Sequence, residues 1–145
     1  MAHEDAGHYG AKHPPGTKLD PKIAEAVKRK IVNDRISCAA AHKIARDLDV
    51  SPADVGIAID LLEMRISKCQ LGLFGYSPQK RIVKPAESLV PELEKAIKKS
   101  VVNNRISCFS CWEIAKRSGI ARMEVSAACE TLKVKIFSCQ LGSFR

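Results

Sequence analysis

The feature that most constrains this chain is an internal duplication. Shifting the 145-residue sequence by 70 positions aligns residues 21–75 with residues 91–145 without a gap, and 20 of the 55 pairs are identical. The identities cluster in two motifs: NxRISC begins at Asn33 and again at Asn103, and CQLGxF begins at Cys69 and again at Cys139. The sequence therefore predicts two copies of one small folding unit.

The segments outside the two copies differ from them in composition. Residues 1–19 are rich in Gly, Pro and His and show no apolar period, which predicts a disordered arm. Residues 77–89 are polar and basic and contain Pro78 and Pro85, which is typical of a linker. We therefore expect repeat 1 over residues 20–76 and repeat 2 over residues 90–145.

Each repeat shows the signals of three helices and a small sheet. Asp20 before Pro21 predicts the start of a helix over about 21–33. Residues 36–38 predict a short strand, residues 40–48 a second helix, and Ser51 caps a third helix that runs to about Glu63. Residues 64–69 alternate like a half-buried strand, and a turn and a return through residues 81–83 follow. The expected fold is mainly α, with a minor β component.

The second and third helices resemble the helix-turn-helix pattern. That pattern has a small residue between the helices, a turn residue four positions later and a branched apolar residue ten positions later; here they are Ala45, Asp49 and Val55, and then Ala115, Gly119 and Val125. The chain is similar in both repeats to winged helix-turn-helix proteins of the repressor-like DNA-binding superfamily. The resemblance implies two tandem units of three helices plus a β-hairpin wing each, and it implies either DNA reading or protein docking.

Charge favours a polyanionic partner. There are 24 Lys and Arg against 16 Asp and Glu, a net charge of +8. The outward face of the third helix, which we expect to include Gly56, Asp60, Ser126 and Glu130, holds few base-reading side chains, and Arg122 is the best of them. Asp60 and Glu130 have the wrong sign for phosphate. We expect phosphate contacts without sequence reading. The candidate nucleic-acid-binding residues are Lys28, Arg29, Arg35, Lys43, Arg46, Arg65, Lys68, Lys98, Lys99, Arg105 and Arg122.

Two further motifs have alternative interpretations. The CQLGxF segments predict either a functional wing tip or a plain turn in which Leu71 and Leu141 pack; the wing residues would be Gln70, Gly72, Gln140 and Gly142. The recurring cysteines predict either strand packing or, as a second alternative, a zinc or iron–sulfur site; they are Cys38, Cys69, Cys108 and Cys139. Cys111 and Cys129 stand where repeat 1 has Ala41 and Ile59, which indicates small buried side chains.

These observations favour a cytoplasmic protein that is not an enzyme. The first residues lack a secretion signal, no stretch is long and apolar enough to span a membrane, and no catalytic motif is found. We expect no required cofactor. The leading hypothesis is a transcription-related DNA-binding protein whose fused repeats act as an intramolecular pseudo-dimer. The alternatives are a winged-helix module that docks on another protein in complex assembly, and a cysteine-based metal or redox sensor.

Overall fold

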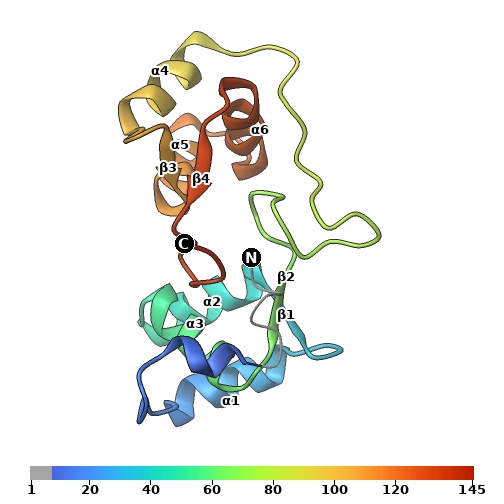
Figure 1. Ribbon diagram of the computed structural model, residues 1–145, viewed down its shortest axis with the longest axis vertical. Helices are drawn as coiled ribbons and strands as arrows, with labels where there is room; N and C mark the ends of the chain where they lie inside the picture. The colour runs from blue at the N-terminus through green and yellow to red at the C-terminus, as the bar shows by residue number, and fades with distance from the viewer. Residues whose placement is uncertain (1–7) are drawn as a thin grey trace. The chain divides into compact units, whose positions relative to one another are not determined.

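The computed structural model describes residues 8–145, which are mainly helical with short strands (Figure 1). After a short 3-10 helix, η2 (Tyr9–Lys12), the order helix, strand, helix, helix, strand occurs twice, and each element of the second series begins 70 residues after its counterpart. The first series is α1 (Pro21–Lys30), β1 (Arg35–Ser37), α2 (Cys38–Leu48), α3 (Pro52–Leu61) and β2 (Arg65–Ser67). The second is α4 (Pro91–Ser100), β3 (Arg105–Ser107), α5 (Cys108–Ser118), α6 (Arg122–Leu132) and β4 (Lys135–Phe137). Within the described residues, no helix is long and apolar enough to cross a membrane.

Helix α1 starts as predicted but ends earlier. The Asp20 carboxylate accepts hydrogen bonds from the backbone N–H groups of Lys22 and Ile23, which caps the helix. The chain then turns sharply, because Asn33 and Asp34 adopt φ values of 52° and 60°. This turn lets Val32 and Arg35 exchange backbone hydrogen bonds of 2.8 and 3.1 Å. The predicted end of this helix at residue 33 was therefore three residues too late. The tight turn leads directly into β1.

The turn between the second and third helix of each repeat follows the prediction from the sequence. Asp49, with a φ of 54°, caps the C-terminus of helix α2, and Gly119, with a φ of 67°, caps that of helix α5. Both residues lie in the left-handed region, which glycine adopts freely and aspartate tolerates. In both repeats, the two helices that flank this turn pack against each other.

The small sheets differ from the predicted wing. β1 pairs with β2 in parallel, with Arg35 opposite Arg65, and β3 pairs with β4 in parallel, with Arg105 opposite Lys135. The α2–α3 pair forms the crossover between two strands that run the same way, so the strands cannot belong to one hairpin. The prediction that these strands form a β-hairpin wing was therefore wrong for the described residues. The expected return through residues 81–83 forms no strand, although the Ile82 N–H does donate to the Gly72 carbonyl at 2.9 Å.

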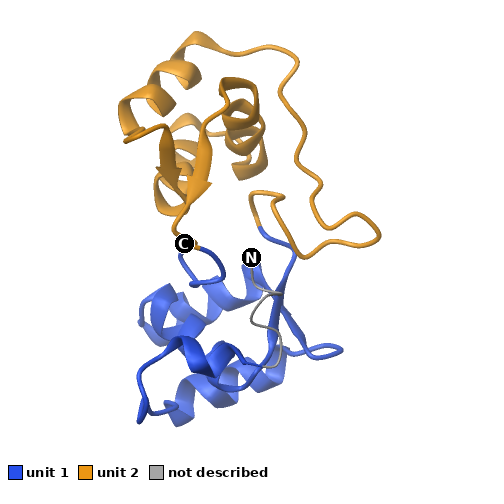
Figure 2. Cartoon of the chain, viewed as in Figure 1, with its two compact units in different colours: residues 1–69, 140–144 blue, residues 70–139, 145 orange. Residues whose placement is uncertain are grey.

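The chain divides into two compact units that depart from the repeat boundaries (Figure 2). Unit 1 consists of Met1–Cys69 together with Gln140–Phe144, and unit 2 consists of Gln70–Cys139 together with Arg145. Residues 140–144, near the end of the second repeat, therefore complete unit 1, and the segment from Gln70 through the linker belongs to unit 2. The Gln-Leu-Gly-x-Phe segments are thus exchanged between the repeats: residues 140–144 of repeat 2 belong to unit 1, and residues 70–74 of repeat 1 belong to unit 2.

The two cores use equivalent positions. Val27, Ile36 and Ile59 are at most 1% exposed in unit 1. Their counterparts in unit 2, Ile97, Ile106 and Cys129, are equally buried. Cys111 is also fully buried, so the prediction that Cys111 and Cys129 serve as small core side chains is confirmed.

Candidate nucleic-acid interface

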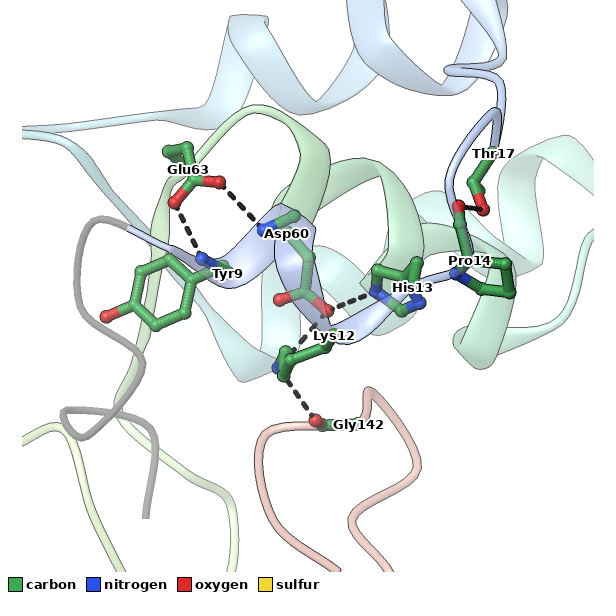
Figure 3. Close-up of polar contacts among 9 residues, drawn as sticks. Tyr9, Lys12, His13, Pro14, Thr17, Asp60, Glu63 and Gly142 are labelled. Atoms are coloured by element: carbon green, nitrogen blue, oxygen red, sulfur yellow. Dashed lines mark hydrogen bonds and ion pairs between the residues drawn. The ribbon is translucent and has the colours of Figure 1, made fainter.

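The N-terminal arm covers helix α3, the helix that a DNA reader of this type would place in the major groove (Figure 3). The Glu63 carboxylate accepts hydrogen bonds of 2.7 Å from the backbone N–H groups of both Tyr9 and Gly10. His13 Nε2 lies 2.7 Å and Lys12 Nζ 3.2 Å from Asp60 Oδ2. Residues 9–13, within the segment that the sequence predicted to be a disordered arm, thus contact α3 and the turn after it, and residues 1–7 lie outside the described part.

The C-terminal segment of unit 1 covers a second part of the same helix. Leu141 is 2% exposed, and a Cβ added to Gly56 would lie only 2.7 Å from the Leu141 carbonyl carbon. Lys12 Nζ also donates a hydrogen bond of 3.1 Å to the Gly142 carbonyl (Figure 3). The absence of a side chain at Gly56 is therefore what allows the segment to approach α3 this closely.

Helix α6 is covered in the same manner within unit 2. Arg122 donates a hydrogen bond of 3.1 Å to Gln70 Oε1, and a Cβ added to Gly72 would lie 3.2 Å from Met123 Sδ. Glu130 forms an ion pair with Arg81. Ser126, the counterpart of Gly56, is fully buried. The expectation that Gly56, Asp60 and Ser126 face outward was therefore wrong.

The covered helices change the interpretation of two groups of predicted residues. Arg122, the best predicted base reader, has its guanidinium carbon 3.6 Å from the centre of the Trp112 ring. Gln70 and Gly72 lie in a segment packed on α6, and Gly142 lies in the segment packed on α3. The CQLGxF motif thus forms a docked turn, with Leu71 and Leu141 buried, and no free wing tip.

Several of the predicted phosphate-binding cations already have a carboxylate partner one helical turn away. Arg29 pairs with Glu25, Lys43 with Asp47, and Lys98 with Glu94, at 2.5, 2.7 and 3.2 Å. Such exposed pairs are weak, but they reduce the local positive field. The other exposed cations of the set have no ion pair within the described residues; they are Lys28, Arg35, Arg46, Arg65, Lys68, Lys99 and Arg105.

The parallel ladders bring the most regularly placed cations together. In β1 and β3, the central isoleucine is buried, so the residues on either side of it point to the opposite face, as do their register partners in β2 and β4. Arg35 and Arg65 are therefore exposed neighbours on the outer face of unit 1, and Arg105 and Lys135 on that of unit 2. Lys135 was absent from the predicted set, although its position 70 residues after Arg65 already indicated it.

The surroundings of the two ladders have opposite charge. In unit 1, a pocket next to the ladder is lined by Asp34 and Glu63 as well as by Arg35 and Arg65. In unit 2, Asn104 and Lys133 replace these two acids. In unit 2, Arg105, Lys133 and Lys135 therefore lack the two carboxylates that line the unit 1 pocket; Glu130, which is ion-paired with Arg81, lines a pocket with Lys133 and Lys135.

This difference extends over the whole of each unit. Unit 1 contains 11 Lys and Arg against 10 Asp and Glu, a net charge of +1. Unit 2 contains 13 against 6, a net charge of +7. Nearly all of the charge that suggested a polyanionic partner is thus in unit 2.

Five of the six cysteines are buried, and one is half-buried. Cys38, Cys69 and Cys108 are buried and Cys139 is half-buried. The thiols of Cys111 and Cys129 are hydrogen-bonded to each other, and this bond and burial raise the pKa of Cys111. Within residues 8–145, no three His, Cys, Asp or Glu side chains are arranged to hold a metal ion.

Comparison of the chain with profiles of known families, with curated proteins and with solved structures finds no match.

Proposed function

We propose that the chain is a nucleic-acid-binding protein that contacts phosphates through the outer ladder face of unit 2. The observation that carries this proposal is the charge difference between the two repeats: Lys133 stands where unit 1 has Glu63, beside the exposed pair of Arg105 and Lys135. Glu130, the carboxylate that lines a pocket with Lys133 and Lys135, is paired with Arg81, and the three cations form a local positive field that attracts a polyanion.

The proposed contact positions the nucleic acid without reading its sequence. The faces of α3 and α6 that would enter a major groove are covered by the arm, by residues 140–144 and by residues 70–72. Lys and Arg contacts to phosphate carry no base information. We therefore propose no sequence-specific regulation through the third helix. The packing of the second and third helices, with a left-handed turn at Asp49 and Gly119, supports a relationship to helix-turn-helix DNA-binding proteins.

A matched pair of double variants tests the proposal. Arg105→Ala with Lys135→Ala removes the two cations of the unit 2 ladder, and Arg35→Ala with Arg65→Ala removes their counterparts in unit 1. Both variants lose two charges at equivalent positions of the fold. We expect the unit 2 variant to weaken binding of a fluorescent DNA about tenfold or more at 0.1 M salt, and the unit 1 variant to weaken it about threefold or less.

The binding is measured by fluorescence anisotropy, with circular dichroism as the check on folding. Equal losses in the two variants would contradict the assignment to unit 2. No saturable binding of any nucleic acid by the wild type at low salt would contradict the function itself.

One observation favours docking on a protein as a second candidate function. Val32 and Val102 occupy the same turn in the two repeats and are 70% and 67% exposed. Apolar side chains presented at equivalent tips suit contact with another protein. Val32→Ser with Val102→Ser would leave DNA affinity unchanged and abolish such a contact.

A further inference from the structure

The two repeats differ in aromatic residues as well as in charge. Phe109 and Phe137 of repeat 2 stand where repeat 1 has Ala39 and Ser67. The fold of repeat 1 shows that the unit folds without aromatic side chains at these positions. A reason for them in repeat 2 must therefore be sought outside the shared core.

Phe137 belongs to the same outer face as the cations. It pairs in register with Ser107, two positions along the ladder from the pair of Arg105 and Lys135, so its side chain points to their side. The guanidinium carbon of Arg105 lies 4.3 Å from the centre of the Phe137 ring, within cation–π distance. The ladder thus presents an aromatic ring directly beside two phosphate-binding candidates.

Phe109 lies at the end of the same ladder. It is the second residue of α5, which begins where β3 ends, and its side chain is 57% exposed. A phenylalanine ring this exposed forgoes much of the stabilisation that its burial would give the fold. Phe137, by comparison, is half-buried, and Arg105 lies over its ring.

From these positions we propose that unit 2 binds single-stranded nucleic acid, with unpaired bases stacked on Phe109 and Phe137. Arg105, Lys133 and Lys135 would hold the phosphates of the same strand. Basic surfaces that also offer aromatic rings bind single strands in this way, because every base has a face that stacks, whereas in a duplex these faces are covered by neighbouring bases. This inference rests on the proposed function and specifies its ligand.

The test uses three fluorescent probes of equal length, about 16 nucleotides, the upper end of what one small single-strand-binding fold covers. They are an oligothymidine, a fully abasic deoxyribose-phosphate strand and a blunt duplex. The variant is Phe109→Ala with Phe137→Ser, which introduces the two residues that repeat 1 carries at these positions. Because repeat 1 folds with those residues, the variant should retain its structure, which circular dichroism verifies.

We expect the wild type to bind oligothymidine more tightly than either other probe. The variant should lose about tenfold to a hundredfold in oligothymidine affinity, the loss expected from one or two unstacked bases, and should bind the abasic strand within about twofold of the wild type. An equal loss on all three probes, or no loss on any, would overturn the inference. If the wild type binds the duplex and the abasic strand as tightly as oligothymidine, phosphate binding stands and base stacking fails; if it binds none of the probes, both fail.

Discussion

Replacement of Gly56 by alanine tests the docking of the C-terminal segment on α3. Gly56 lies inside α3, where alanine would ordinarily be the better helix former. A Cβ at this position would, however, lie 2.7 Å from the backbone carbonyl carbon of Leu141, so the backbone of the segment would have to move. The two effects have opposite signs.

The expected size follows from the burial of Leu141. This side chain is 2% exposed, and loss of its burial costs about 1.5 to 3 kcal/mol. The gain in helix stability from glycine to alanine is about 0.5 to 1 kcal/mol. We therefore expect Gly56→Ala to lower the free energy of unfolding by about 1 to 2 kcal/mol. In a chain that lacks residues 140–145, the same substitution should be stabilising.

Urea unfolding monitored by circular dichroism measures both effects. Trp112, the single tryptophan, lies in unit 2, so its fluorescence follows that unit separately. We expect the dichroism midpoint to fall further than the fluorescence midpoint. A stabilising effect of Gly56→Ala in the full chain, or the same destabilisation with and without residues 140–145, would refute the docked segment.

Three further predictions concern the buried polar groups. Lys12→Ala with His13→Ala leaves the buried Asp60 carboxylate without these two partners and should cost about 3 kcal/mol in urea unfolding; an unchanged stability would mean that the arm does not pack on α3. Cys139, the half-buried cysteine among five buried ones, should react first with iodoacetamide under native conditions, as mass spectrometry can verify; faster modification of the others would contradict the described cores. Ser126→Ala removes a buried hydroxyl that has no hydrogen-bond partner within the described residues, so stability should stay equal or rise by up to about 1 kcal/mol, and a marked loss would reveal a partner.

The local parts of the fold could be predicted from the sequence because their causes are local. Asp20 and Ser51 cap the helices that they were predicted to start, and Asp49 adopts the left-handed turn expected of it. Apolar periodicity and capping act within one or two helical turns, so the order of residues already contains them.

The long-range parts could not be predicted in this way. Three interactions join segments that are far apart in the chain. They are the pairing of β1 with β2, the packing of Leu141 against Gly56, and the hydrogen bonds from Tyr9 and Gly10 to Glu63. The CQLGxF sequence is equally compatible with a free wing and with a turn that packs on a helix of the other repeat. One signal was available for the ladder, because Arg-Ile-Ser occurs at both Arg35 and Arg65.

The candidate site was predicted only in part for the same reason. The duplication identified Arg35 and Arg105 as repeated cations, but their ladder partners emerged only from the strand register, and the net charge of each unit only from the boundaries of the units. Gly56 and Ser126, which were expected on the outward face, are buried, so an acid introduced at either position would disrupt packing.

The most direct test of phosphate binding by unit 2 is the salt dependence of affinity in two variants of equal net charge. Arg105, Lys133 and Lys135 are replaced by alanine in one, and Arg29, Lys43 and Lys98, which already have carboxylate partners, in the other. The slope of log affinity against log salt for duplex DNA should become shallower by about 2 to 3 in the first variant and by less than about 1 in the second. Equal changes in the two slopes would show that net charge alone drives binding, and would contradict a phosphate site on the ladder of unit 2.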